Sequence, residues 1–316
     1  MGGYHLNALQ QLAAGNYEDY YKGGINNLLS KIRVVGLCDI LPGRTENNHN
    51  IDRFDFLPEM LESTSPHILI VATPTNTHKE MASSAIECGV HTFVEKPIVA
   101  NVSQLNELMS LARKKGCKLI AGHVERYNPV SIKIISLLKD VKPLVENYSF
   151  TRTQKHDTRI TDDIITDKVI HDLDLALYFF GAISSIKIDN FRMSGEKVYE
   201  LGLRVEHQNG TKGSIFVSWL DEQQTKKRQV EIAQGGHTWK GDFVSKQLWV
   251  DGAEIKCEVQ GMVKPANNQI KDELVDFIAS CINVAPLQEF IPLLSIEEIS
   301  ESTRWLEDIY KQIQMR

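Results

Sequence analysis

The chain has 316 residues, of which 42% are hydrophobic and 24% charged, and its formal net charge is −6. This composition is ordinary for a globular protein, and the length suffices for two domains with separate cores. The negative charge argues against nucleic-acid and anionic-membrane partners, and no stretch approaches the roughly 18 apolar residues of a membrane span. Because no apolar signal region stands at the N-terminus, we expect a cytoplasmic protein.

The cysteines point to neither a disulfide framework nor a metal site. The chain has five of them, at Cys38, Cys88, Cys117, Cys257 and Cys281. Five is an odd number, and no two cysteines form a C-x-x-C pair. We therefore expect buried free thiols in a reducing compartment and predict no metal.

The first third of the chain alternates short apolar runs with helical patterns. Continuous apolar runs predict buried strands at 32–39, 67–73, 90–95 and 117–122. Helical patterns follow the second and third runs, at about 77–88 and 103–115. Buried parallel strands joined by helices form a doubly wound α/β sheet of the Rossmann type, which binds ligands at the carboxyl ends of its strands. The residues that follow each strand are therefore the candidate site.

The pattern changes beyond residue 122. Asn209 and Gly210 lie between two alternating runs, which is a strong hairpin signal. Further strands are predicted at 144–152, 229–233, 247–251 and 254–259, and helices at about 129–139, 166–180, 268–283 and 295–313. We therefore predict a dinucleotide-binding α/β domain at 1–122 and an α+β domain at 123–316 with a mainly antiparallel, open sheet.

Polar residues follow the first two predicted strands. Asp39 ends the first, where an acid accepts hydrogen bonds from ribose hydroxyls and repels a 2′-phosphate, which favours NAD over NADP. A capping or surface role is the alternative for Asp39. Thr73 and Pro74 turn the chain after the second strand, and Thr77 is placed to cap the next helix. The free N–H groups of that helix suit a polar ligand, and simple capping is the alternative.

Lys96 follows the third predicted strand. The next residue, Pro97, keeps Lys96 out of the helical region and holds it extended. A lysine at the carboxyl end of a central parallel strand is poorly placed for a solvated surface role, so we consider it for proton transfer. The alternative is a lysine whose stem is covered while its ammonium group reaches water.

A second candidate cluster lies in the sequence DKVIHDLD. Asp167 and His171 are four residues apart, so they share one face of a helix, and Asp174 lies three residues further on. A carboxylate beside an imidazole fixes its tautomer and raises its basicity. The alternatives are the polar face of an amphipathic helix and a metal site, although the segment lacks an H-E-x-x-H pattern.

Together these segments resemble a known family. The sequences VATPTNTH, VEKP, GHVERYNP and DKVIHDLDLALYFFG, in this order, are similar to the Gfo/Idh/MocA oxidoreductases. The resemblance implies a Rossmann domain, and a second domain whose open sheet forms dimer or tetramer contacts. It also implies oxidation or reduction of a sugar or cyclitol hydroxyl with NAD(P). The last two motifs are most similar to the branch that acts on UDP-N-acetylglucosamine at C3.

The resemblance also implies the residues of the site. Lys96 and His171 flank the substrate carbinol as catalytic residues, and Asp167 supports the substrate or the histidine. The expected cofactor-binding residues are Gly2, Asp39, Thr73, Pro74, Asn76, His78, Glu95, Lys96 and Asn128. The expected substrate-binding residues are Lys96, Arg126, Tyr127, Asp167 and His171. Arg152 and Arg159 are candidates for binding a diphosphate, while Ile164, Ile165 and Thr166 replace the family's glycine pair, so sugar preference does not carry over.

The first residues match only the end of the family's nucleotide fingerprint. The family pattern is Gly-x-Gly-x-Met-Gly-x-x-His, and Met1 to His5 match its closing Met-Gly-x-x-His. Gly2 is then the last fingerprint glycine, at the start of the helix that faces the pyrophosphate. The first strand and the first two glycines are missing from the sequence. We expect either that Met1 is an internal methionine or that the sheet lacks a central strand, which would weaken stability and cofactor affinity.

Two other classes of protein remain open. Some relatives are regulators that bind NAD(P) without turnover, and a chain with a damaged nucleotide site could serve as an inactive scaffold. The presence of Lys96, Asp167 and His171 together favours an enzyme, because a binding protein has no need of all three.

Overall fold

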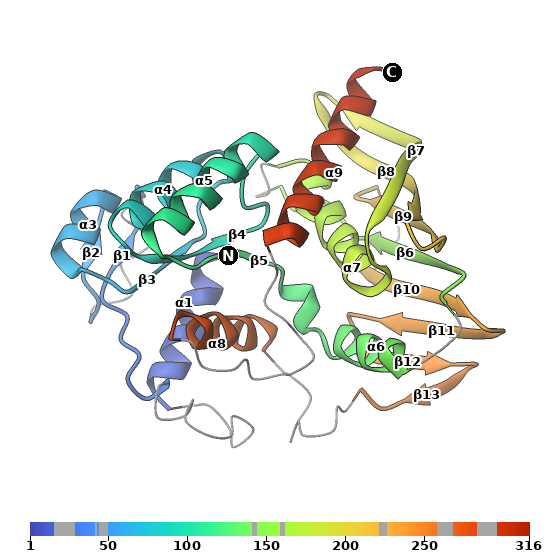
Figure 1. Cartoon of the computed structure of the whole chain (residues 1–316), viewed down its shortest axis with the longest axis horizontal. Helices are drawn as coiled ribbons and strands as arrows, with labels where there is room; N and C mark the ends of the chain where they lie inside the picture. The colour runs from blue at the N-terminus through green and yellow to red at the C-terminus, as the bar shows by residue number, and fades with distance from the viewer. Residues whose placement is uncertain are drawn as a thin grey trace. The chain divides into compact units, whose positions relative to one another are not determined.

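The computed structural model describes residues 1–15, 29–41, 43, 50–140, 144–158, 162–220, 226–257, 268–282 and 296–316. The chain divides into two compact units (Figure 1). Unit 1 comprises Met1–Gly122 and Asn268–Leu294, and unit 2 comprises His123–Asn267 and Ser295–Arg316. The domain boundary predicted from the sequence also falls after residue 122, but that prediction places 268–294 in the second domain. Contacts that are distant in sequence place this segment in unit 1 instead.

Unit 1 is built on parallel strands. Its strands are β1 (Leu37–Cys38), β2 (Arg53–Phe54), β3 (Ile68–Val71), β4 (His91–Glu95) and β5 (Leu119–Gly122). β1 pairs with β2 in one parallel sheet, and β3, β4 and β5 form a second one in that order. The Rossmann fold has the strand order 3-2-1-4-5-6, to which β2-β1 and β3-β4-β5 correspond as 3-2 and 4-5-6. Among the described residues, no strand joins β1 to β3.

Helices cover both faces of the three-stranded sheet. The helices of unit 1 are α1 (Gly2–Ala13), α3 (Leu57–Thr64), α4 (His78–Glu87), α5 (Val102–Lys115) and α8 (Gln269–Cys281). α4 packs on β3, β4 and α5, while α1 and α8 pack together on the opposite face (Figure 1). Phe277 of α8 contacts Phe93 of β4 in the core, with ring centroids 5.6 Å apart. A parallel sheet covered in this way confirms the predicted α/β class.

Unit 2 contains one large mixed sheet. Its strands are β6 (Asn147–Thr153), β7 (Ile183–Ser194), β8 (Lys197–His207), β9 (Lys212–Ser218), β10 (Lys227–Gln234), β11 (His237–Asp242), β12 (Gln247–Val250) and β13 (Ala253–Ile255). Their order is β13-β12-β11-β10-β6-β9-β8-β7, and every neighbouring pair is antiparallel except β6 and β9. This confirms the predicted α+β domain with a mainly antiparallel sheet. β7, β11 and the short elements α3 and β2 were not predicted.

The helices of unit 2 lie on one face of this sheet (Figure 1). They are α6 (Pro129–Asp140), α7 (Ile170–Phe180) and α9 (Ile296–Gln314), with shorter turns at η3 (Val124–Tyr127) and η4 (Ile165–Val169). The core between the layers is rich in aromatic residues. The Tyr148 ring stacks on Phe180 at 4.1 Å and covers Gly213, the residue opposite it on β9. A Cβ at position 213 would lie 2.0 Å from that ring, so glycine is required there.

Two smaller expectations have mixed outcomes. All five cysteines are free, as predicted, but Cys88 is exposed and the other four are only half-buried. The expectation of buried thiols is therefore wrong: Cys38, Cys257 and Cys281 pack against core clusters, but their side chains keep some exposure. No helix in the described parts of the chain has the length and apolar character needed to cross a membrane.

Candidate active site

In unit 1, Lys96 directly follows the central strand β4 and is half-buried. The preceding residue, Glu95, is only 7% exposed, and its two oxygens have different partners. Oε1 lies 2.6 Å from Nε2 of His5 on α1, and Oε2 accepts a hydrogen bond from the Lys96 backbone N–H at 3.2 Å. Glu95 therefore fixes the backbone of Lys96 to the helix that carries the fingerprint residues. The expected contact of Glu95 with the cofactor stays a prediction.

His78 links the two loops that follow β3 and β4. Its Nδ1 lies 2.8 Å from the carbonyl oxygen of Pro97, and its Nε2 lies 2.9 Å from that of Thr73. The side chain is buried, and each ring nitrogen lies within hydrogen-bond distance of a backbone carbonyl oxygen. His78 thus holds together the two loops that carry candidate residues, and its expected contact with the cofactor stays a prediction.

The other predicted cofactor residues of unit 1 lie at strand ends and are accessible. Thr73, Pro74 and Asn76 are exposed after β3, and Asp39 is half-buried after β1. Thr77 Oγ1 lies 2.7 Å from Thr73 Oγ1 and does not cap α4, so the capping alternative is wrong.

Gly2 begins α1 next to the end of β3. A Cβ at Gly2 would lie 3.9 Å from Cβ of Ala72, so the N-terminus of α1 lies beside that strand end. A helix N-terminus with glycines suits a pyrophosphate, and the acid after β1 suits a ribose. These residues fit NAD.

The His5–Glu95 pair predicts acid sensitivity of unit 1. Burial alone would raise the pKa of Glu95, but the hydrogen bond and charge of His5, with Lys96, hold that pKa below its ordinary value. A carboxyl group whose folded-state pKa is depressed stabilises the fold above its unfolded value of about 4.3, and this contribution is lost as the pH falls further. We expect Glu95→Gln to cost about 1.5–3 kcal/mol at pH 7 and to flatten the stability loss below about pH 4.5.

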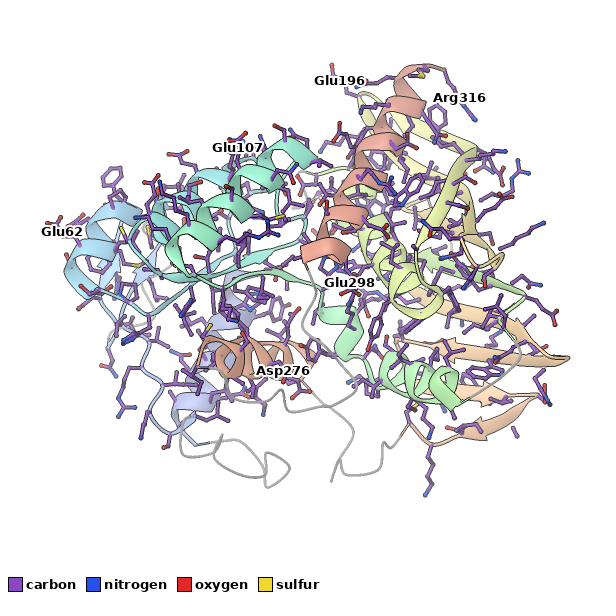
Figure 2. The ribbon with its side chains drawn as sticks, viewed as in Figure 1. Glu62, Glu107, Glu196, Asp276, Glu298 and Arg316 are labelled. Carbon is purple, nitrogen blue, oxygen red and sulfur yellow. The ribbon has the colours of Figure 1, made fainter. Side chains whose placement is uncertain are left out.

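Hydrogen exchange followed by mass spectrometry, on peptides that span α1 and β4, measures this effect. Glu62→Gln is the matched control, because Glu62 is an exposed carboxylate on α3 (Figure 2). Equal acid sensitivity in Glu95→Gln and the unmodified chain would contradict the prediction.

In unit 2, the D-x-x-x-H motif begins in a π-helical turn rather than in regular α-helix. The turn η4 spans Ile165–Val169, and α7 continues from Ile170. Asp163 supports the turn: its Oδ1 accepts hydrogen bonds from the backbone N–H groups of Ile165 and Thr166 at 3.0 and 3.2 Å. The hydroxyl of Tyr310 on α9 donates to the same oxygen at 2.7 Å. Single π-turns occur often at functional sites, which fits the place of Asp167 and His171.

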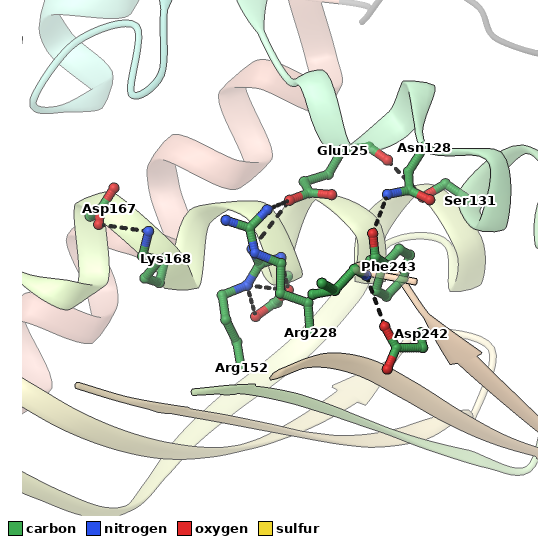
Figure 3. Close-up of polar contacts among 11 residues, drawn as sticks. Glu125, Asn128, Ser131, Arg152, Asp167, Lys168, Arg228, Asp242 and Phe243 are labelled. Atoms are coloured by element: carbon green, nitrogen blue, oxygen red, sulfur yellow. Dashed lines mark hydrogen bonds and ion pairs between the residues drawn. The ribbon is translucent and has the colours of Figure 1, made fainter. Parts of the chain in front are cut away.

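Asp167 has a close cationic partner that the sequence analysis did not single out. Nζ of Lys168 lies 3.0 Å from Oδ2 of Asp167, and both side chains are largely buried (Figure 3). Burial, with the nearby guanidinium groups of Arg152 and Arg228, lowers the pKa of Lys168 to about 8 against the opposing pull of Asp167. His171, one helical turn further on, is half-buried.

Arg152 was a candidate for binding a diphosphate, but it is buried and neutralised. Its guanidinium bonds to Asp172 at 2.6–3.1 Å and to Oε1 of Glu125 at 3.2 Å (Figure 3). The same Glu125 oxygen accepts a hydrogen bond from Arg228 Nη1 at 2.6 Å. Burial alone would raise the pKa of Glu125, but Arg152 and Arg228 hold it below its ordinary value. Arg152 therefore ties β6 to α7 inside unit 2.

Arg126 was expected to bind substrate and is also a structural residue. It is 1% exposed, and its Nε and Nη2 donate to Asp174 at 2.9 and 2.7 Å. Its Nη1 donates to Glu298 at 3.1 Å, and the guanidinium lies 4.5 Å from the ring centroid of Tyr178. Asp174 accordingly faces Arg126 and His123 in the interior of unit 2, not the face expected from its spacing to His171.

The two residues after Arg126 are buried as well. The amide of Asn128, a residue expected to bind the cofactor, donates to the Phe243 carbonyl at 3.0 Å (Figure 3), and its oxygen accepts from the Val130 N–H at 3.1 Å. Tyr127, expected to bind substrate, is 4% exposed. Both residues take part in the packing of unit 2, and their expected ligand contacts stay predictions. Arg159 lies outside the described residues, and the described residues hold no cluster of three or more His, Cys, Asp or Glu side chains suited to a metal.

Lys168, Glu125 and Arg228 were not predicted from the sequence. Lys168 lies in the sequence DKVIHDLD, and its place between Asp167 and His171 is the signal that points to it. Glu125 and Arg228 are 103 residues apart and meet only through folding.

Comparison with known proteins agrees with this fold. Residues 5–123 match the model of an oxidoreductase family with an NAD-binding Rossmann fold, GFO_IDH_MocA. This part of the chain belongs to that family, which confirms the resemblance drawn from the motifs. The class of protein is therefore an NAD-binding oxidoreductase.

Individual relatives are more distant. The chain is 25% identical over 224 residues to UDP-N-acetylglucosamine 3-dehydrogenase from Acidithiobacillus ferrooxidans, covering 70% of this chain and 68% of the relative. It is 28% identical to scyllo-inositol 2-dehydrogenase (NAD(+)) from Bacillus subtilis, covering 54% and 53%. Several curated relatives are matched over only about half of their length.

Among solved structures, levoglucosan dehydrogenase in complex with NADH and levoglucosan has the same fold. The TM-score is 0.82 at 14% sequence identity, and the alignment covers 100% of this chain and 95% of that one.

Proposed function

We propose that this protein is an NAD-dependent dehydrogenase or reductase that acts on a secondary hydroxyl or ketone of a sugar. The leading candidate is a nucleotide sugar such as UDP-N-acetylglucosamine, oxidised at C3. The observation that carries the proposal is the setting of Lys96, which follows the central strand β4 and is fixed by Glu95 and His5. The acid and exposed polar residues that follow the neighbouring strands fit NAD, and two of the relatives above are dehydrogenases of a nucleotide sugar and an inositol.

The chemistry assigned to the chain is positioning and proton transfer. Bound NAD would accept the hydride from the substrate carbon, which leaves the hydroxyl proton to be removed. Lys96 or His171 takes that proton during oxidation and returns it during reduction, while the other hydrogen-bonds the same oxygen. Asp167 supports His171 or the substrate and is itself held by Lys168. The products are a keto sugar, NADH and one proton.

A substrate screen tests the proposal. Nucleotide sugars, free sugars and cyclitols are incubated with NAD and the protein, and the absorbance of NADH is followed, alongside a second chain extended upstream in the reading frame. Turnover of a sugar class by either chain supports the proposal. Binding of NAD without turnover of any compound would favour a regulator, and absence of NAD binding in both chains would favour a scaffold.

The proposal includes assembly and location. We expect a cytoplasmic homodimer or homotetramer formed through the sheet of unit 2, whose face opposite the helices exposes Phe216. Light scattering after size-exclusion chromatography measures the mass, and a monomer would contradict this part of the proposal.

A further inference from the structure

One end of the β6–β10 pair in unit 2 carries an excess of positive charge. Within the described residues, the cluster there has one more cation than carboxylates. Its members are Arg152, Lys168, Lys226, Arg228, Glu125, Asp167 and Asp172. The three carboxylates form hydrogen bonds with some of these cations and not equally with all of them. Arg152 takes both oxygens of Asp172, and Oε1 of Glu125 is shared between Arg152 and Arg228 (Figure 3).

The remaining cations repel one another. The charge of Arg228, with partial burial, lowers the pKa of Lys226. Burial and the charge of Arg152 lower the pKa of Arg228, and burial with both guanidinium groups lowers that of Lys168. An anion placed among these side chains would relieve the repulsion, because opposite charges within a few ångströms favour the ionised forms.

The geometry leaves this charge accessible. Side chains alternate along β10, so Arg228 points to the inner face of the sheet and Lys227 to the outer face. Lys226, which precedes the strand, lies near enough to Arg228, Glu125 and Arg152 to interact with their charges. Lys226 is exposed and the Arg228 side chain is 24% exposed. Nε of Arg228 has no hydrogen-bond partner among the described residues. Lys168 belongs to the same charge cluster and lies on the turn that carries Asp167, three residues before His171.

We propose that Lys168, Lys226 and Arg228 bind a phosphate group of the substrate, so that the sugar on which this protein acts is a phosphate-bearing one. This inference rests on the proposed function and narrows its substrate class. A sugar phosphate and the diphosphate of a nucleotide sugar present the same chemistry to these cations. A neutral free sugar or cyclitol would leave the charge of the cluster unbalanced.

Isothermal titration calorimetry on NADH-saturated protein tests the proposal without requiring turnover. The ligands are N-acetylglucosamine, its 1-phosphate, UDP-N-acetylglucosamine and inorganic pyrophosphate. We expect the phosphate-bearing ligands to bind, and to bind roughly tenfold or more weakly to Lys226→Met and Arg228→Met, because each variant removes a charged partner. Lys227→Met removes the same charge from the opposite face and is expected to bind like the unmodified protein. Arg228→Lys is expected to restore part of the affinity.

The variants and ligands separate the possible outcomes. Because Arg228 also bonds to Glu125, circular dichroism checks that the Arg228 variants are folded. If Arg228→Met does not fold, the binding measured with Lys226→Met tests the inference. Equal affinity for N-acetylglucosamine and its 1-phosphate, or unchanged binding by Lys226→Met, overturns the inference, as does failure of every phosphate-bearing ligand to bind. Which phosphate-bearing ligand binds most tightly distinguishes a sugar phosphate from a nucleotide sugar.

The inference and the proposed function can fail separately. Turnover of neutral sugars alone would support the proposed dehydrogenase activity and contradict the proposed phosphate site. If pyrophosphate binding depends on Lys226 and Arg228 but no sugar is turned over, the result would support the phosphate site. It would contradict the proposed dehydrogenase activity.

Discussion

Replacing Lys96 by alanine is expected to remove most turnover while leaving NAD binding nearly unchanged. General acid–base catalysis by a positioned side chain contributes roughly 10²–10⁴-fold, so kcat should fall by about that factor. Glu95, His5 and His78 hold the backbone around Lys96 and Pro97 in place, and the substitution does not change these three residues. Loss of a group that acts on the reacting proton lowers mainly kcat and changes KM little.

Steady-state kinetics on a substrate found by the screen, together with NADH titration, measure both quantities. Lys114→Ala is the control, because Lys114 is an exposed lysine on α5 in the same unit. Unchanged turnover in Lys96→Ala would reject the catalytic role, and equal losses of NADH affinity and turnover would assign Lys96 to cofactor binding.

The largest loss of stability is expected for Asp174→Asn in unit 2. Burial alone would raise the pKa of Asp174, but Arg126 and His123 hold it well below its usual range. The substitution removes the carboxylate that faces the buried guanidinium of Arg126, and Glu298, its other carboxylate partner, is 31% exposed. Breaking one side of a buried ion pair costs about 3–5 kcal/mol, because a buried charge is left uncompensated.

The tryptophans make this effect measurable. All four, Trp219, Trp239, Trp249 and Trp305, belong to unit 2, so their fluorescence during urea unfolding reports on this unit. Asp189→Asn is the matched control: Asp189 pairs with Arg204 at 2.5 Å, but the pair is solvent-exposed and is worth less than about 1 kcal/mol. Similar unfolding midpoints for the two variants would show that the Arg126 pair contributes no more than a surface pair.

The sequence predicted best what depends on local pattern. The apolar runs at 67–73, 90–95 and 117–122 contain β3, β4 and β5, because a buried parallel strand needs continuous apolar residues. The first run, 32–39, contains only the two-residue strand β1. A strand needs a hydrogen-bonded neighbour, and among the described residues β1 pairs only with the short β2.

What the sequence did not predict depends on distant contacts. Arg126 looks like a site residue because it follows a Rossmann strand, yet its partner Asp174 lies 48 residues away. α8 looks like part of the second domain, but the packing of Phe277 on Phe93 joins it to unit 1. The π-turn before His171 depends on Tyr310, which is 147 residues from Asp163. None of these pairings leaves a periodic signal in the sequence.

The strand pairing of unit 1 indicates that its candidate residues follow strands of different rigidity. Among the parallel strands that the structure describes in this unit, only β4 is hydrogen-bonded on both sides, while β1 and β3 each have one paired edge. Backbone amides open most rarely where both edges are paired and the side chains are buried. Lys96 follows the stiffest strand, whereas Asp39 and Thr73 follow strands that fray more easily. The proton-transfer group would therefore hold its position while the cofactor contacts adjust around it.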